Sequence, residues 1–120
     1  MYNKMHHYLS LLCMRSKRNF LYGLKLFSEG IGLQHGEIMI EFPDNPDRED
    51  CYKKKYSDCV GFYNDYDPPD LFVPMQEFLN YLKKTSETYL ADKDSTYKEQ
   101  ANLYLRKIYK RYSDYIHRSN

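Results

Sequence analysis

Cysteine, histidine and tryptophan are scarce in this 120-residue chain, and their scarcity removes several classes of protein. Tryptophan is absent, and there are three cysteines and four histidines. Cys13, Cys51 and Cys59 are odd in number and show no CxxC spacing, which argues against a zinc site. Free thiols in a chain without an export signal predict a reducing, cytoplasmic compartment.

Long apolar runs are also missing. No window approaches the roughly 18 apolar residues of a membrane span, so no span is predicted. The apolar centre from Tyr8 to Met14 has its positive charges mainly after it and no small-residue cleavage site, which favours a helix over an export signal. Met1 and Met14 each qualify as the start, so residues 1–16 are either part of the domain or a helical extension of it.

Signals for catalysis are weak. The chain has no phosphate-binding glycine loop of Walker or Rossmann type. Its scattered histidines, His6, His7, His35 and His117, give no base held against a nucleophile. We therefore predict a protein that is not an enzyme and that holds no metal ion or cofactor.

The residues that are abundant predict one folded domain over residues 1–120. Hydrophobic residues make up 42% and aromatic residues 17%, with 14 tyrosines. Tyrosine suits half-buried positions and is enriched at interfaces, so these side chains serve the rim of the core or a binding surface.

Periodicity predicts the order of the elements. A helical pattern runs from Asn3 to about Gly30, as one helix or two. Alternation from Glu37 to Phe42 predicts a strand, Cys59 to Tyr63 a second, and Leu71 to Val73 a short third. Residues 44–50 read as a loop, and residues 52–56 as either an exposed strand edge or a loop.

Two helices complete the predicted chain. Pro74 suits a first helical position, and apolar residues recur behind it as far as Leu90. Thr96 and Glu99 predict a capping box at the start of a last helix that runs to about Ile116. The fold class is therefore α+β, with helices packed on a small antiparallel sheet in the order α-β-β(-β)-α-α.

Charge is distributed unevenly. Residues 41–70 carry nine Asp/Glu against four Lys/Arg, whereas the flanking segments are mildly basic. Pro68 and Pro69 stiffen an acidic turn within this segment. Carboxylates and tyrosines gathered in loops suit a basic partner, since charge accelerates encounter and desolvated rings supply binding energy. The predicted contacts are Asp65, Tyr66, Asp67 and Asp70, a second patch of Asp47, Glu49 and Asp50, and Tyr63.

A nucleic-acid-binding protein is the alternative. Lys53–Lys55 lies between two tyrosines, and the last helix interleaves tyrosines with basic residues. Such an arrangement can hold a phosphate backbone and stack bases.

Three segments resemble bacterial immunity proteins of contact-dependent growth inhibition systems. They are GEIMIEFPDN, VGFYNDYDPPDLFVPMQEFLNYL and the closing tyrosine-rich helix, and the similarity spans roughly residues 20–110. The resemblance implies a small cytoplasmic protein that neutralises a cognate toxin domain, often a ribonuclease. It identifies no contact residues, so the predicted site depends on charge and turn chemistry alone.

Overall fold

A computed structural model describes residues 17–32, 34–35, 38–64 and 69–118. In these ranges the elements are α2 (Lys17–Ser28), β1 (Gln34–His35), β2 (Ile38–Glu41), α3 (Asp50–Lys55), β3 (Cys59–Asn64), β4 (Leu71–Pro74), α4 (Met75–Leu90) and α5 (Ser95–Arg118). The predicted α+β class is confirmed. The predicted single domain over residues 1–120 and the extension at residues 1–16 reach outside the described residues.

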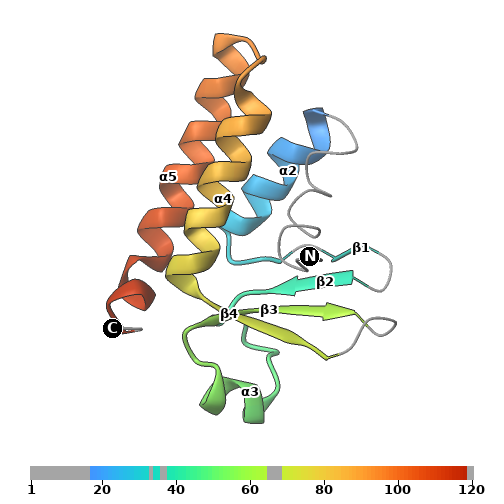
Figure 1. Cartoon of the computed structure of the whole chain (residues 1–120), viewed down its shortest axis with the longest axis vertical. Coiled ribbons are helices and arrows are strands. Elements are labelled where there is room, and N and C mark those ends of the chain that lie inside the picture. The colour runs from blue at the N-terminus through green and yellow to red at the C-terminus, as the bar shows by residue number, and fades with distance from the viewer. Residues whose placement is uncertain (1–16, 33, 36–37, 65–68, 119–120) are drawn as a thin grey trace.

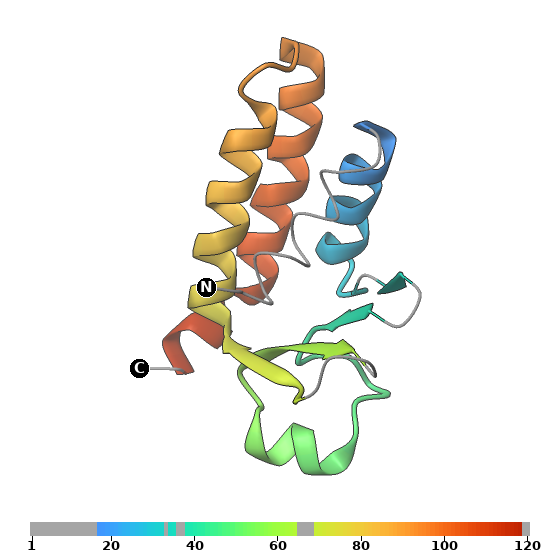
Figure 2. The same ribbon diagram turned by 45° about the vertical axis from the view of Figure 1, so that its right-hand side comes forward.

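The four strands form an antiparallel sheet in sequence order, β1-β2-β3-β4. Helices α2, α4 and α5 stand on one side of this sheet, and the short helix α3 lies on the other side (Figures 1 and 2). Because successive side chains of a strand point to opposite faces, each strand contributes side chains to both faces of the sheet. We call the side with the three long helices the inner face and the side with α3 the outer face.

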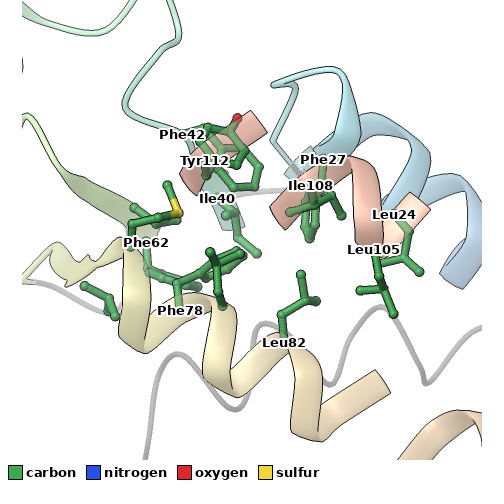
Figure 3. Close-up of a cluster of buried hydrophobic side chains, with 14 of the residues drawn as sticks. Leu24, Phe27, Ile40, Phe42, Phe62, Phe78, Leu82, Leu105, Ile108 and Tyr112 are labelled. Atoms are coloured by element: carbon green, nitrogen blue, oxygen red, sulfur yellow. The ribbon is translucent and has the colours of Figure 1, made fainter. Parts of the chain in front are cut away.

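Aromatic rings at the centre of the inner face join sheet and helices (Figure 3). Phe42, just after β2, meets Phe27 of α2 and Phe78 of α4 edge-on, with ring centroids 5.1 and 5.5 Å apart. Tyr112 of α5 stacks on the same ring at 4.9 Å. The core is completed by buried apolar residues from the sheet and from α2, α4 and α5, among them Leu24, Ile40, Val60, Phe62, Val73, Leu82 and Ile108.

Gly30 ends α2 close to the predicted boundary, and Gly32 follows where the chain turns toward the sheet. Gly30 has φ +79°, and the amides of Gly30 and Ile31 donate to the carbonyls of Phe27 and Leu26. This is the Schellman motif, in which a glycine adopts the left-handed backbone conformation. Gly32 lies directly against the carbonyl of Ile40, where a Cβ atom has no room.

Three local predictions were wrong. Residues 52–56 are predicted to form a strand edge or a loop, but residues 52–55 belong to α3 (Asp50–Lys55) and Tyr56 is its C-cap. The cap of α5 is Asp94, whose carboxylate accepts a 2.9 Å bond from the Tyr97 amide, so Thr96 lies inside the helix. Pro74 ends β4 and precedes the first helical residue, with ψ 143°.

The segment between β2 and β3 is tied to the helices by Asp44. Its carboxylate accepts bonds from Arg111 Nε at 2.9 Å and from the Tyr112 hydroxyl at 3.0 Å. Burial and the Asp44 carboxylate raise the pKa of Tyr112, which keeps this hydroxyl protonated as a donor. Asp44 therefore fixes the start of the acidic segment to α5.

Candidate partner-binding surface

The outer face of the sheet carries polar and aromatic side chains where the inner face is apolar. Glu41, Gly61 and Phe72 lie side by side across β2, β3 and β4, as the strand register dictates. Tyr63 follows on the same face of β3, two residues after Gly61. These positions form the floor on which α3 and its flanking turns rest.

A glycine at position 61 makes room for the Tyr63 side chain. A Cβ atom at this position would collide with the Tyr63 hydroxyl, so the tyrosine extends across the space that a side chain would fill. From there its hydroxyl donates to Glu41 Oε1 at 2.7 Å. Burial and this carboxylate raise the pKa of Tyr63, so the hydroxyl stays a donor.

Arg48 is a buried cation at the centre of the outer layer. Its side chain is fully buried, and Nε lies 2.9 Å from Glu41 Oε1. The remaining guanidinium nitrogens donate to the carbonyls of Glu41, Tyr56 and Cys59 at 3.0–3.3 Å. Asn45 donates to the other oxygen of Glu41 at 3.1 Å. A buried charge is tolerated when it is paired and hydrogen-bonded. The bonds of Arg48 reach both ends of the excursion, as we call the segment that connects β2 to β3.

Helix α3 packs on the sheet through Tyr52, within the helix, and Tyr56, directly after its last residue. Tyr56 stacks on Phe72 with ring centroids 3.7 Å apart, and Tyr52 lies 4.8 Å from the same ring. Tyr52 also stacks on Tyr63 at 6.0 Å. Side chains at i and i+4 share one face of a helix, so the opposite face of α3 is left to solvent.

The solvent side of this excursion carries the predicted second patch. Asp47, Glu49 and Asp50 are all exposed. Asp70, at the edge of β4, is exposed too and accepts a 3.2 Å bond from the Tyr52 hydroxyl. That hydrogen bond, with the nearby Glu49 charge, raises the pKa of Tyr52. We call Asp47, Glu49, Asp50 and Asp70 the acidic α3 surface.

Among the predicted contact residues, the structure places Asp70 beside the second patch and gives Tyr63 a supporting role. Asp70 joins the second patch through Tyr52. Tyr63 is half-buried and bonded to Glu41, so it supports the surface from below. Asp65, Tyr66 and Asp67 lie outside the described residues. The predicted site did not include Glu41 and Arg48. The signal in the sequence that could have identified them is a single arginine inside an acidic segment.

Three lysines of α3 lie close in the chain to Asp47, Glu49 and Asp50. Lys53, Lys54 and Lys55 are exposed at its C-terminal end, where they complement the helix dipole. Lys53 lies 3.8 Å from Asp50 and donates to the Pro46 carbonyl. The tyrosines that a nucleic-acid site would need, Tyr52 and Tyr56, pack on Phe72 instead of facing solvent.

The described residues contain no group of three or more His, Cys, Asp or Glu side chains placed to hold a metal ion. In the same ranges, Cys51 and Cys59 are free thiols. Burial raises the pKa of Cys59, which lowers its reactivity as a nucleophile. None of the helices described has the length and apolar character to cross a membrane.

Comparison with known proteins gives one family. The sequence model of the CDI immunity protein family matches residues 2–105, which include all of the described sheet, α2, α3, α4 and the first part of α5. No curated protein and no solved structure matches the chain.

Proposed function

Since the chain belongs to the CDI immunity protein family, whose members neutralise toxins of contact-dependent growth inhibition, we propose that it binds its cognate toxin through the acidic α3 surface. It acts by binding and not by catalysis. The sequence-based assignment of Asp65, Tyr66 and Asp67 to this surface stays part of the proposal, as neighbours of Asp70 in the chain.

The fully buried Arg48 is the observation that carries this proposal. A loop in a surface excursion is ordinarily mobile, and ordering it on binding costs free energy. Here one guanidinium bonds the backbone at Glu41, Tyr56 and Cys59, and the stacked tyrosines hold α3 from the other side. The backbone that carries the exposed carboxylates is thus held in one arrangement before the partner binds.

The charge of this surface indicates the kind of partner. Four exposed carboxylates on a fixed support suit a basic protein surface. A nuclease domain, whose active site is built to hold phosphate, has such a surface, and covering it would stop the reaction. We therefore propose that the toxin is a nuclease, of the ribonuclease class, and that the two proteins meet in the cytoplasm, where the substrates of such a toxin are.

Charge reversal tests the proposal directly. The triple variant Asp47→Lys, Glu49→Lys, Asp50→Lys should weaken binding of the cognate toxin domain at least about 30-fold, which corresponds to about 2 kcal/mol. It should also stop protecting cells that express the toxin domain. A matched control, Glu77→Lys, Glu99→Lys, Asp114→Lys, makes the same charge change at exposed positions on α4 and α5. Equal losses for both triple variants would reject the assignment of the surface.

The nucleic-acid alternative predicts a different result. If Lys53–Lys55 and α5 held a phosphate backbone, the isolated protein would bind RNA with an affinity that falls steeply as salt rises. Asp47→Lys, Glu49→Lys, Asp50→Lys would then strengthen that binding. The packed tyrosines of α3 favour the toxin-binding function.

A further inference from the structure

A groove between α4 and α5 forms a second candidate site, on the opposite side of the sheet from α3. It encloses about 310 Å³. Its lining comes from one face of each helix: Lys83, Ser86, Glu87 and Leu90 from α4, and Asn102, Leu105, Arg106 and Tyr109 from α5. This volume is at the lower end of the range for small-molecule sites, roughly 300–1,000 Å³.

Two hydroxyl groups in this groove have no hydrogen-bond partner among the described residues. Ser86 is 1% exposed, and neither its Oγ atom nor the Tyr109 hydroxyl is bonded. A buried hydroxyl without a partner destabilises the fold, so such groups are rare and call for an explanation. Burial, with a smaller contribution from Glu87, raises the pKa of Tyr109, and its hydroxyl therefore remains a donor.

The charged side chains of the groove are unpaired as well. In the part of the chain that the structure describes, Lys83, Glu87 and Arg106 form no ion pair within 4 Å. Two cations and two hydroxyl donors thus face one carboxylate, an excess of donors over acceptors. Leu90 and Leu105, each 7% exposed, supply an apolar floor.

We propose that this groove binds a small organic carboxylate, with the acid group held by Lys83, Arg106 and the hydroxyls and a short apolar stem on the leucines. A carboxylate supplies the acceptors that the donors lack, and charge-assisted bonds are the stronger kind. The volume exceeds what one acidic side chain of a protein partner would fill, which favours a free small acid. The site is independent of the acidic α3 surface.

Titration of the full chain with 4-methylpentanoate tests this proposal, with 4-methylpentanamide as a neutral probe of matched shape at constant ionic strength. Amide NMR shifts should saturate at residues lining the groove, with a dissociation constant on the order of 10 mM for so small a ligand. The amide should bind at least about threefold more weakly. Absence of saturable shifts, or equal binding of acid and amide, would overturn the proposal.

Adjacent lysines provide a matched control. Lys83→Gln and Lys84→Gln make the same charge change at neighbouring exposed positions of α4, but only Lys83 lines the groove. Lys83→Gln should weaken binding of the acid at least about threefold, and Lys84→Gln should not. If instead Lys83→Gln weakened toxin binding while the free acid did not bind, the groove would belong to the protein interface and the small-ligand proposal would be wrong.

Stability of Ser86→Ala separates a ligand group from a structural one. Removing an unpaired hydroxyl should leave the melting temperature unchanged or raise it, while weakening binding of 4-methylpentanoate. A fall in melting temperature of several degrees would show that Ser86 supports the fold itself, which contradicts the proposed role.

Discussion

Different interactions hold the helices on the two faces of the sheet. One face serves mainly the stability of the fold, and the other serves recognition of a partner. On the inner face, rings and aliphatic side chains such as Phe42, Phe78 and Leu82 are fully buried against three helices. On the outer face, a charged network and a stack of tyrosines fix one short helix. Apolar packing is non-directional, whereas hydrogen bonds specify positions. The inner face thus provides most of the folding energy, and the outer face provides a defined shape for a partner.

The largest expected effect tests the inner face. Phe42→Ala removes the ring that α2, α4 and α5 share and should lower the free energy of unfolding by about 3–5 kcal/mol in urea denaturation. Phe72→Ala, at the half-buried counterpart on the outer face, should cost less stability but weaken toxin binding, because Tyr52 and Tyr56 lose their support. Equal stability losses would show that the two faces do not differ as described.

The buried arginine comes next. Arg48→Met keeps much of the volume but removes one donor from the Glu41 carboxylate and the Arg48 donor from the carbonyls of Glu41, Tyr56 and Cys59, and should cost about 3 kcal/mol. Lys54→Met removes a positive charge from the exposed side of α3 and should change stability by less than about 0.5 kcal/mol. Near-native stability and unchanged toxin affinity for Arg48→Met would refute the role given to the outer network.

Gly61→Ala asks whether the outer layer tolerates crowding. The added methyl group would displace the Tyr63 hydroxyl from Glu41, and we expect a loss of about 1–3 kcal/mol. In a Tyr63→Ala background the same substitution should cost much less, since the clash is gone. A double-mutant cycle measures this coupling. Additive costs would mean that the glycine is needed for another reason.

The smallest effect appears at alkaline pH. Folding raises the pKa values of Tyr63 and Tyr112, one from each face, above the unfolded value near 10. Above pH 10 the unfolded chain binds fewer protons than the folded chain, so stability falls as pH rises, by at most about 1.4 kcal/mol per pH unit for the buried Tyr112. The contribution of the half-buried Tyr63 should be smaller, because solvent screens its hydroxyl. Tyr63→Phe and Tyr112→Phe should each flatten this slope in denaturation curves. A slope unaffected by either substitution would contradict the burial of both hydroxyls.

Periodic patterns in the sequence predicted the elements of the inner face. The structure of the outer face depends on contacts between residues that are distant in the sequence. Alternation around Ile40 and Phe62 and the apolar stripe of α4 follow from local sequence, so strands and helices could be predicted. Helix α3 could not, because its six residues include three lysines. Tyr52 in this helix and Tyr56 just after it pack on Phe72, which lies 20 and 16 residues further along the chain. Propensity is a weak guide where tertiary packing decides.

The candidate site shows the same division. Composition identified the acidic segment and the exposed Asp47, Glu49 and Asp50. It could not show that Glu41 and Asp44 in the same segment are used inside the fold, since pairing with Arg48 and Arg111 depends on the sheet and on α5. Charge counts give the sign of a surface, and only the structure shows which charges remain for a partner.

Amide hydrogen exchange of the protein with and without its cognate toxin domain tests the central claim most directly. Binding through the acidic α3 surface should add protection over residues 47–58 and 69–72, and leave the exchange of α2 and the far half of α5 unchanged. Protection confined to the helices of the inner face, with no change around α3, would contradict the account and place the toxin on the other side of the molecule.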